Sequence, residues 1–232
     1  MMQEHRIKLW DLPTRLFHWL LVVLVVSAFA TGLTGGRWID WHGWIGQAIF
    51  GLIIFRLVWG FIGSTYARFS QFVHGPKTML VYLRGRWHGM GHNPLGGISV
   101  MVLLALMLFQ SLTGLFATDD IAFSGPLKSL VSSETSVWLS SLHRQAIWII
   151  GGFVGLHVLA TLFHTWVRGD NLIRPMLTGY KMTREPMAHS AKGGGLLAFV
   201  LALAITAGAV WIANGGLLSP PPPAPTGSVP DW

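Results

Sequence analysis

Four histidines lie inside or at the ends of long apolar stretches, where ionisable side chains are rare and mark functional sites. They are His18, His42, His143 and His157. His143 and His157 are 14 residues apart, which on one helix places them on almost the same face and about 21 Å apart along the axis. Neutral imidazoles are common metal ligands, and the sequence has no cysteine to supply a thiolate or a covalent haem link. The sequence therefore indicates a metal or redox centre held by imidazole nitrogens.

Composition indicates that the elements carrying these histidines are membrane helices. Of the 232 residues, 52% are hydrophobic and only 11% are charged, whereas soluble domains carry about 25% charged residues. Stretches long enough to cross about 30 Å of hydrocarbon are predicted at Leu16–Leu33, Trp44–Ile62, Ile98–Phe116, His143–Val167 and Leu196–Ala213. The predicted class is an all-α integral membrane protein with five spans.

Basic residues alternate with these spans. Twelve would lie on one side of the membrane, namely Arg6, Lys8, Arg15, Arg68, Lys77, Arg84, Arg86, Arg168, Arg174, Lys181, Arg184 and Lys192. Because Lys and Arg in short loops stay cytoplasmic, we predict a cytoplasmic N-terminus and an external C-terminus. The same alternation accounts for the net charge of +7, so no nucleic-acid partner is expected.

The first span has an alternative interpretation as a secretory signal that ends at Ala28-Phe29-Ala30. Cleavage there would remove His18. We favour a retained helix because the apolar run continues for a full helix length.

The predicted topology sorts the four histidines into two layers. His18 falls level with His157 on the cytoplasmic side, and His42 falls level with His143 on the external side. Two pairs of facing imidazoles suit two haems b, because each iron takes an axial nitrogen on both faces. Zinc would instead need three or four ligands at one depth, and hydrogen-bonded interior histidines would not need matched depths. Five further histidines, expected to be solvated in loops or tails, are His5, His74, His88, His92 and His189.

The 14-residue interval also predicts what lies opposite two ligands. It leads from His18 to Gly32 and from His42 to Arg56. We expect Gly32 beside the external haem, where a missing side chain lets the macrocycle approach; ordinary helix packing is the alternative. Arg56 would pair with a haem propionate or, second, with a quinone headgroup; snorkelling to the interface is the alternative.

Three segments carry a resemblance to a known family. They are Leu-Trp-Asp-Leu-Pro-Thr-Arg-Leu-Phe-His-Trp at 9–19, Trp-His-Gly-Trp-Ile-Gly at 41–46, and Leu-His-Arg at 142–144 followed by His157. Together they resemble the bacterial di-haem cytochromes b, which include the 561-type cytochrome b and the membrane subunits of nickel-iron hydrogenases and formate dehydrogenases. The resemblance covers roughly residues 5–182.

This resemblance implies a four-helix transmembrane bundle that binds two non-covalent haems b, with His18 paired to His157 and His42 paired to His143. It also implies the bacterial inner membrane as the location, so that the external C-terminus would be periplasmic. The chain departs from the smaller members by its fifth helix. We expect a di-haem domain at 1–182, a linker and the fifth transmembrane helix at 183–214, and a Pro-rich external tail at 215–232. The role of the fifth helix, including a possible homo-oligomer contact, stays open.

The function implied is electron transfer through the haems between a membrane quinone and a periplasmic redox partner, such as a cytochrome c, a hydrogenase or a dehydrogenase. One alternative is a superoxide:quinone-type oxidoreductase that acts without a protein partner. Another is a non-redox membrane module, which would bind no haem and would leave the paired histidines unexplained.

Overall fold

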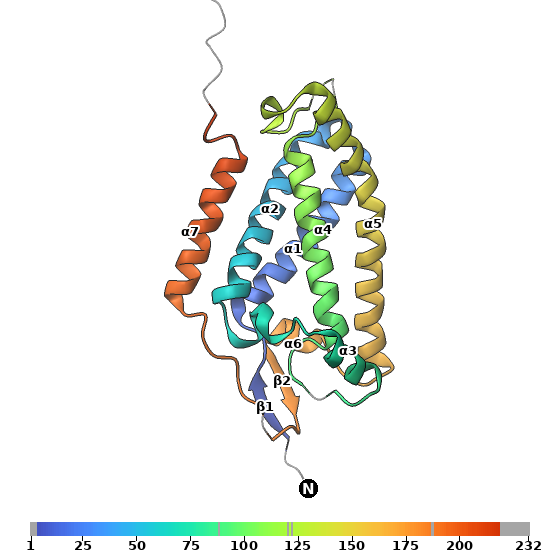
Figure 1. The fold of residues 1–232 in the computed structure, drawn as a ribbon, viewed down its shortest axis with the longest axis vertical. Helices are drawn as coiled ribbons and strands as arrows, with labels where there is room; N and C mark the ends of the chain where they lie inside the picture. Colours follow the sequence, from blue (N-terminus) through green and yellow to red (C-terminus); the bar gives the residue numbers. More distant parts are fainter. Residues whose placement is uncertain (1–3, 88, 120, 122, 187, 219–232) are drawn as a thin grey trace, which may run out of the picture.

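Five long helices dominate the computed structural model, which describes residues 4–87, 89–119, 121, 123–186 and 188–218. Four of them stand side by side (Figure 1), namely α1 (Leu12–Thr34), α2 (Ile39–Ile62), α4 (Pro94–Leu115) and α5 (Ser133–Trp166). The fifth, α7 (Leu196–Ala213), lies along the outside of α2. All five are long and apolar enough to cross a membrane. The prediction of an all-α, multi-pass membrane protein is confirmed.

Shorter elements mark the two ends of the bundle. One end, here called the sheet end, carries α3 (Pro76–Leu83), α6 (Ile173–Thr178) and the strands β1 (His5–Lys8) and β2 (Tyr180–Thr183). The strands pair antiparallel, with His5 opposite Thr183 and Lys8 opposite Tyr180. The other end, the loop end, carries the segment 116–132. Four 3₁₀ turns lie at Gly36–Trp38, Thr65–Ala67, Phe69–Gln71 and Lys128–Leu130.

Side-chain caps set where three of the helices begin. The carboxylate of Asp11 accepts from Thr14 N at 2.8 Å to start α1, and the Asn93 side chain does the same for α4. Ser132 caps α5, so this helix begins ten residues before the predicted His143. Each cap satisfies a backbone N–H that the first helical turn leaves free.

Helix α2 is the centre of the packing, and it contacts α1, α4 and α7 along its length, while α5 packs along α4. Its Ile53 and Trp59 side chains are fully buried. The two halves, α1 with α2 and α4 with α5, are therefore the bodies between which the histidines must meet.

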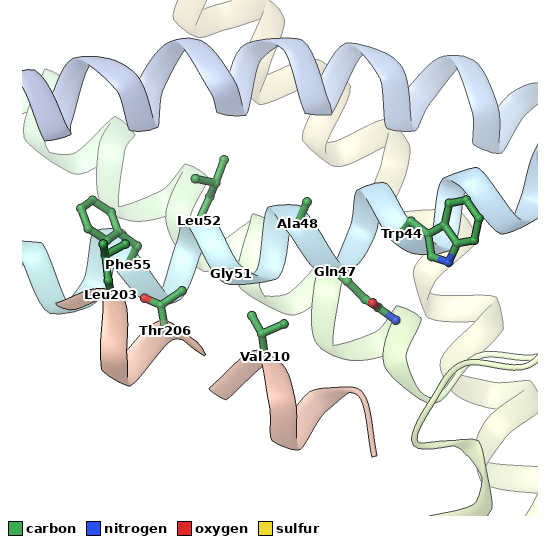
Figure 2. A pocket seen from close by; sticks show the side chains of 9 residues that line it. All are labelled: Trp44, Gln47, Ala48, Gly51, Leu52, Phe55, Leu203, Thr206 and Val210. Carbon is green, nitrogen blue, oxygen red and sulfur yellow. The ribbon is translucent and has the colours of Figure 1, made fainter. Parts of the chain in front are cut away.

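The fifth helix packs on the core through small residues. Figure 2 shows Thr206 and Val210 of α7 along the face of α2 that carries Gly51. A side chain at Gly51 would stand 3.1 Å from Val210 Cγ2, so glycine permits the close approach. Of the predicted Pro-rich tail, 219–232 lies outside the described residues.

Candidate functional site

The loop-end pair joins α2 to α5. The rings of His42 and His143 lie with their centroids 5.9 Å apart and their planes at 90°. Bonds from an imidazole nitrogen to a metal are about 2 Å long, so this centroid separation is close to that expected for two ligands of one metal ion. The structure thus brings together the two histidines that were predicted to share the external layer.

Backbone carbonyls orient both rings of this pair. His42 Nδ1 lies 3.0 Å from Ala28 O on α1, and His143 Nδ1 lies 3.0 Å from Gln110 O on α4. A carbonyl can only accept a hydrogen bond, so Nδ1 carries the proton in both rings and Nε2 keeps its lone pair. This is the arrangement by which proteins fix metal-ligating histidines, and it fits an axial ligand.

A matching Thr-Gly step supports each ring. Thr31 Oγ1 lies 3.4 Å from His42 Nδ1, and Thr113 Oγ1 lies 3.2 Å from His143 Nδ1. A Cβ at Gly32 would stand 2.8 Å from His42 Cε1, and one at Gly114 would stand 3.0 Å from His143 Cε1. Both glycines therefore leave room for an imidazole. Gly32 was expected to face the haem macrocycle, but in the structure it faces the imidazole ring of His42.

This double step is visible in the sequence as a repeated tripeptide. Thr-Gly-Leu occurs at 31–33 in α1 and again at 113–115 in α4, with the accepting carbonyl four residues before each glycine. The two occurrences place equivalent contacts for a histidine ring on the two halves of the bundle.

The sheet-end pair is held differently. His18 on α1 and His157 on α5 are both half-buried and close enough to interact electrostatically. His18 packs edge-on against Trp19, with the centroids 5.0 Å apart. Its Nδ1 is buried without a hydrogen-bond partner in the described part of the chain. No carbonyl fixes the tautomer of His18 as at the loop end.

Arg56 lies beside this second pair, inside the protein. Only 2% of it is exposed, which excludes snorkelling to the interface. Its guanidinium stands 5.0 Å from the Phe69 ring centroid and 5.9 Å from that of Phe72. Its Nη1 is buried with no acceptor among the described residues. Such a group is costly unless a ligand or counter-ion satisfies it.

His92 corrects one expectation, because it is not a solvated loop residue. Its ring lies between Trp10, at 4.8 Å, and Phe72, at 4.6 Å between centroids. Burial first, and then the nearby charge of Arg56, lower its pKa to about 3. The Gly-rich loop around it gave no periodic signal to place it inside.

The other histidines expected in loops or tails lie apart from both pairs. His5 is half-buried in β1, His74 Nδ1 hydrogen-bonds Phe72 O at 2.9 Å, and His189 is exposed. His88 lies outside the described residues.

The prokaryotic cytochrome b561 family model matches residues 9–179, which include α1, α2, α4, α5 and all four ligand candidates. The chain belongs to this family. It is a membrane cytochrome that carries electrons, and haem b is its prosthetic group.

Relatives of the cytochrome have hydrogenase names. The probable Ni/Fe-hydrogenase 1 B-type cytochrome subunit of Escherichia coli (strain K12) is 23% identical over 211 residues, covering 74% of this chain and 89% of the relative. The probable Ni/Fe-hydrogenase B-type cytochrome subunit of Rhizobium leguminosarum bv. viciae is 22% identical over 223 residues, covering 79% and 92%. No solved structure is significantly similar to the chain.

Proposed function

We propose that this cytochrome holds two haems b, one between His18 and His157 and one between His42 and His143, and that electrons cross the membrane through both. The observation that carries the proposal is the loop-end pair, with its ring centroids 5.9 Å apart and both Nδ1 atoms hydrogen-bonded to carbonyls. Helix α5 supplies one ligand to each pair, so a single rigid element fixes the spacing between the haems.

Two further residues have roles in the proposal. Arg56 neutralises a propionate of the sheet-end haem, because it is buried and its Nη1 lacks an acceptor among the described residues. Gly32 contributes to the loop-end haem site through His42, whose ring occupies the space that a side chain would fill.

Haem, when bound, supplies the one-electron chemistry. The chain's own groups supply the axial nitrogens, hold their tautomer at the loop end, and enclose both sites in an apolar bundle. Low polarity and fixed ligands are the means by which a protein sets a haem's potential.

The distribution of basic residues supports an orientation in the membrane, and the names of the relatives support a redox partner. With its basic segments in the cytoplasm of a bacterium, the sheet end faces inward and the loop end faces the periplasm. There the loop-end haem would exchange electrons with a redox protein, and the sheet-end haem would serve a membrane quinone. The names of the relatives favour a nickel-iron hydrogenase over a cytochrome c or another dehydrogenase.

The test is haem reduction by hydrogen in membranes that contain this cytochrome and the hydrogenase of the same organism. We expect hydrogen to reduce two haems b per chain, as counted by the pyridine haemochrome assay, and added quinone to reoxidise them. His143→Ala should lose the periplasmic entry haem and hydrogen-dependent reduction, while His18→Ala should keep entry and lose quinone reoxidation.

His189→Ala, which changes an exposed histidine, is the matched control and should behave as the wild type. One haem per chain in the wild type, or unchanged haem content in both ligand variants, would contradict the ligand assignment. Full haem content with no reduction by hydrogen would leave the ligand assignment standing and would contradict a hydrogenase as the redox partner.

A further inference from the structure

Buried polar atoms without partners gather at one end of the molecule. In the described part of the chain they belong to Thr14, Arg15, His18, Arg56, Ser64, Arg68, His92 and Gln110. All but Gln110 belong to the start of α1, the end of α2 or the segments that follow them at the sheet end. Buried polar groups in folded proteins normally have partners, so this concentration points to a missing acceptor.

Two of these residues, Arg56 and His92, pack near the same side chain. Arg56 stands over the Phe72 ring, and the His92 ring packs on the same phenylalanine at 4.6 Å between centroids. The two residues also interact electrostatically, and His92 interacts in the same way with His18 and His157. The two residues therefore lie close together and near the sheet-end ligand pair, and each has a buried nitrogen without a partner among the described residues.

The nearest carboxylate is already engaged. Asp11 interacts electrostatically with Arg56, but its two oxygens accept from Thr14 N at 2.8 Å and from Trp59 Nε1 at 2.9 Å. Both bonds lie in buried surroundings. Asp11 is thus held as a helix cap, and Arg56 Nη1 and His92 Nδ1 remain without a partner among the described residues.

We infer that Arg56 and His92 together form a carboxylate-binding site whose ligand is a propionate of the haem between His18 and His157. The inference rests on the proposed function and adds His92 to it. A propionate matches the site in charge and in donor number, since a carboxylate accepts both a charged guanidinium hydrogen bond and a neutral imidazole one. Its attachment to the haem accounts for the position of the site beside the ligand pair.

The test is a redox titration that resolves the two haems in the purified full-length cytochrome. Arg56→Gln and His92→Phe should each lower the potential of the sheet-end haem alone, because each removes a donor that offsets the propionate charge. For Arg56→Gln we expect at least a tenfold fall in the reduced-to-oxidised ratio at fixed potential, which is about 59 mV for one electron. His92→Asn keeps an N–H donor and should restore part of the shift.

Infrared redox difference spectra of protein carrying haem with ¹³C-labelled propionates identify the ligand. The labelled carboxylate band should move in Arg56→Gln and His92→Phe and stay in Arg86→Gln, which removes an exposed charge at the same end. Two bound haems with unchanged potentials and an unmoved band would overturn the inference and leave the haem ligands standing. Shifts that vanish once quinone is extracted would assign the site to a quinone oxygen instead.

Discussion

The two ends of this cytochrome hold their histidines in opposite ways. At the loop end, both rings are oriented by carbonyls and by matching Thr-Gly steps of the chain itself. At the sheet end, the His18 Nδ1 has no partner in the described part of the chain, and further buried polar atoms at the same end also lack partners there. The protein alone defines the geometry of one site, while the other site has polar groups that a ligand must complete.

This difference matches what each end would need to do. A site with pre-oriented ligands has a small reorganisation energy when the metal gains or loses an electron. A site rich in unsatisfied donors responds to the charge of what it binds. Changes that displace a ligand ring at the loop end should therefore alter ligation, and changes at the sheet end should alter potential and stability.

The largest effect is expected from Gly32→Val. A branched side chain there would overlap the His42 ring, because even a Cβ would lie 2.8 Å from Cε1. We expect the loop-end haem to be lost and the sheet-end haem to remain, so that the haemochrome assay gives one haem per chain.

Gly152→Val is the control, since no atom of the described residues lies within 4 Å of a Cβ at that glycine. A Gly32→Val protein with two haems and unchanged spectra would show that the glycine does not seat the ligand.

A smaller effect is expected from Trp59→Phe at the sheet end. Trp59 is fully buried and its Nε1 donates to Asp11 Oδ2 at 2.9 Å. Loss of a buried bond to a carboxylate should lower the free energy of unfolding by about 2 kcal/mol, measured by thermal unfolding in detergent. Trp148→Phe, at a position that is 74% exposed, should leave stability nearly unchanged. Equal effects of the two substitutions would show that the bond between Trp59 and Asp11 does not stabilise the sheet end.

The smallest effect is expected from Thr113→Val. This change removes the hydroxyl that lies 3.2 Å from His143 Nδ1 but keeps the carbonyl bond to Gln110. The loop-end haem should stay bound, with a potential shift equivalent to about 1 kcal/mol, measured by redox titration. Thr161→Val is matched to it, since within the described residues that hydroxyl bonds only the carbonyl of His157 in its own helix. A loss of haem in Thr113→Val would mean that the threonine is essential to ligation rather than a second support.

The sequence predicted the membrane helices well because each is a long, nearly uncharged apolar run, and α7 begins and ends where it was predicted. The start of α5 was missed because the stretch Ser133–Leu142 is rich in Ser and reads as a loop. In the structure, the Ser136 and Ser140 hydroxyls donate to the carbonyls of Phe116 and Thr118 and hold that turn against the loop end.

Within the candidate site, the pairing of His42 with His143 could be predicted from their depth in the membrane, because the order of the spans fixes the depth of each residue. The position of His92 did not follow, since only the tertiary contacts with Trp10 and Phe72 bring that loop inside. The pairing of β1 with β2 was missed for the same reason, because it joins strands about 170 residues apart in the sequence.

Low-temperature EPR spectroscopy of the oxidised protein tests most directly whether each histidine pair holds its own haem. We expect two low-spin ferric signals of equal spin count in the wild type. The 90° angle between the His42 and His143 rings predicts a highly anisotropic signal for the loop-end haem, which should disappear in His143→Ala and persist in His157→Ala. Loss of both signals together in folded variants, or of neither, would contradict two independent histidine-ligated haems.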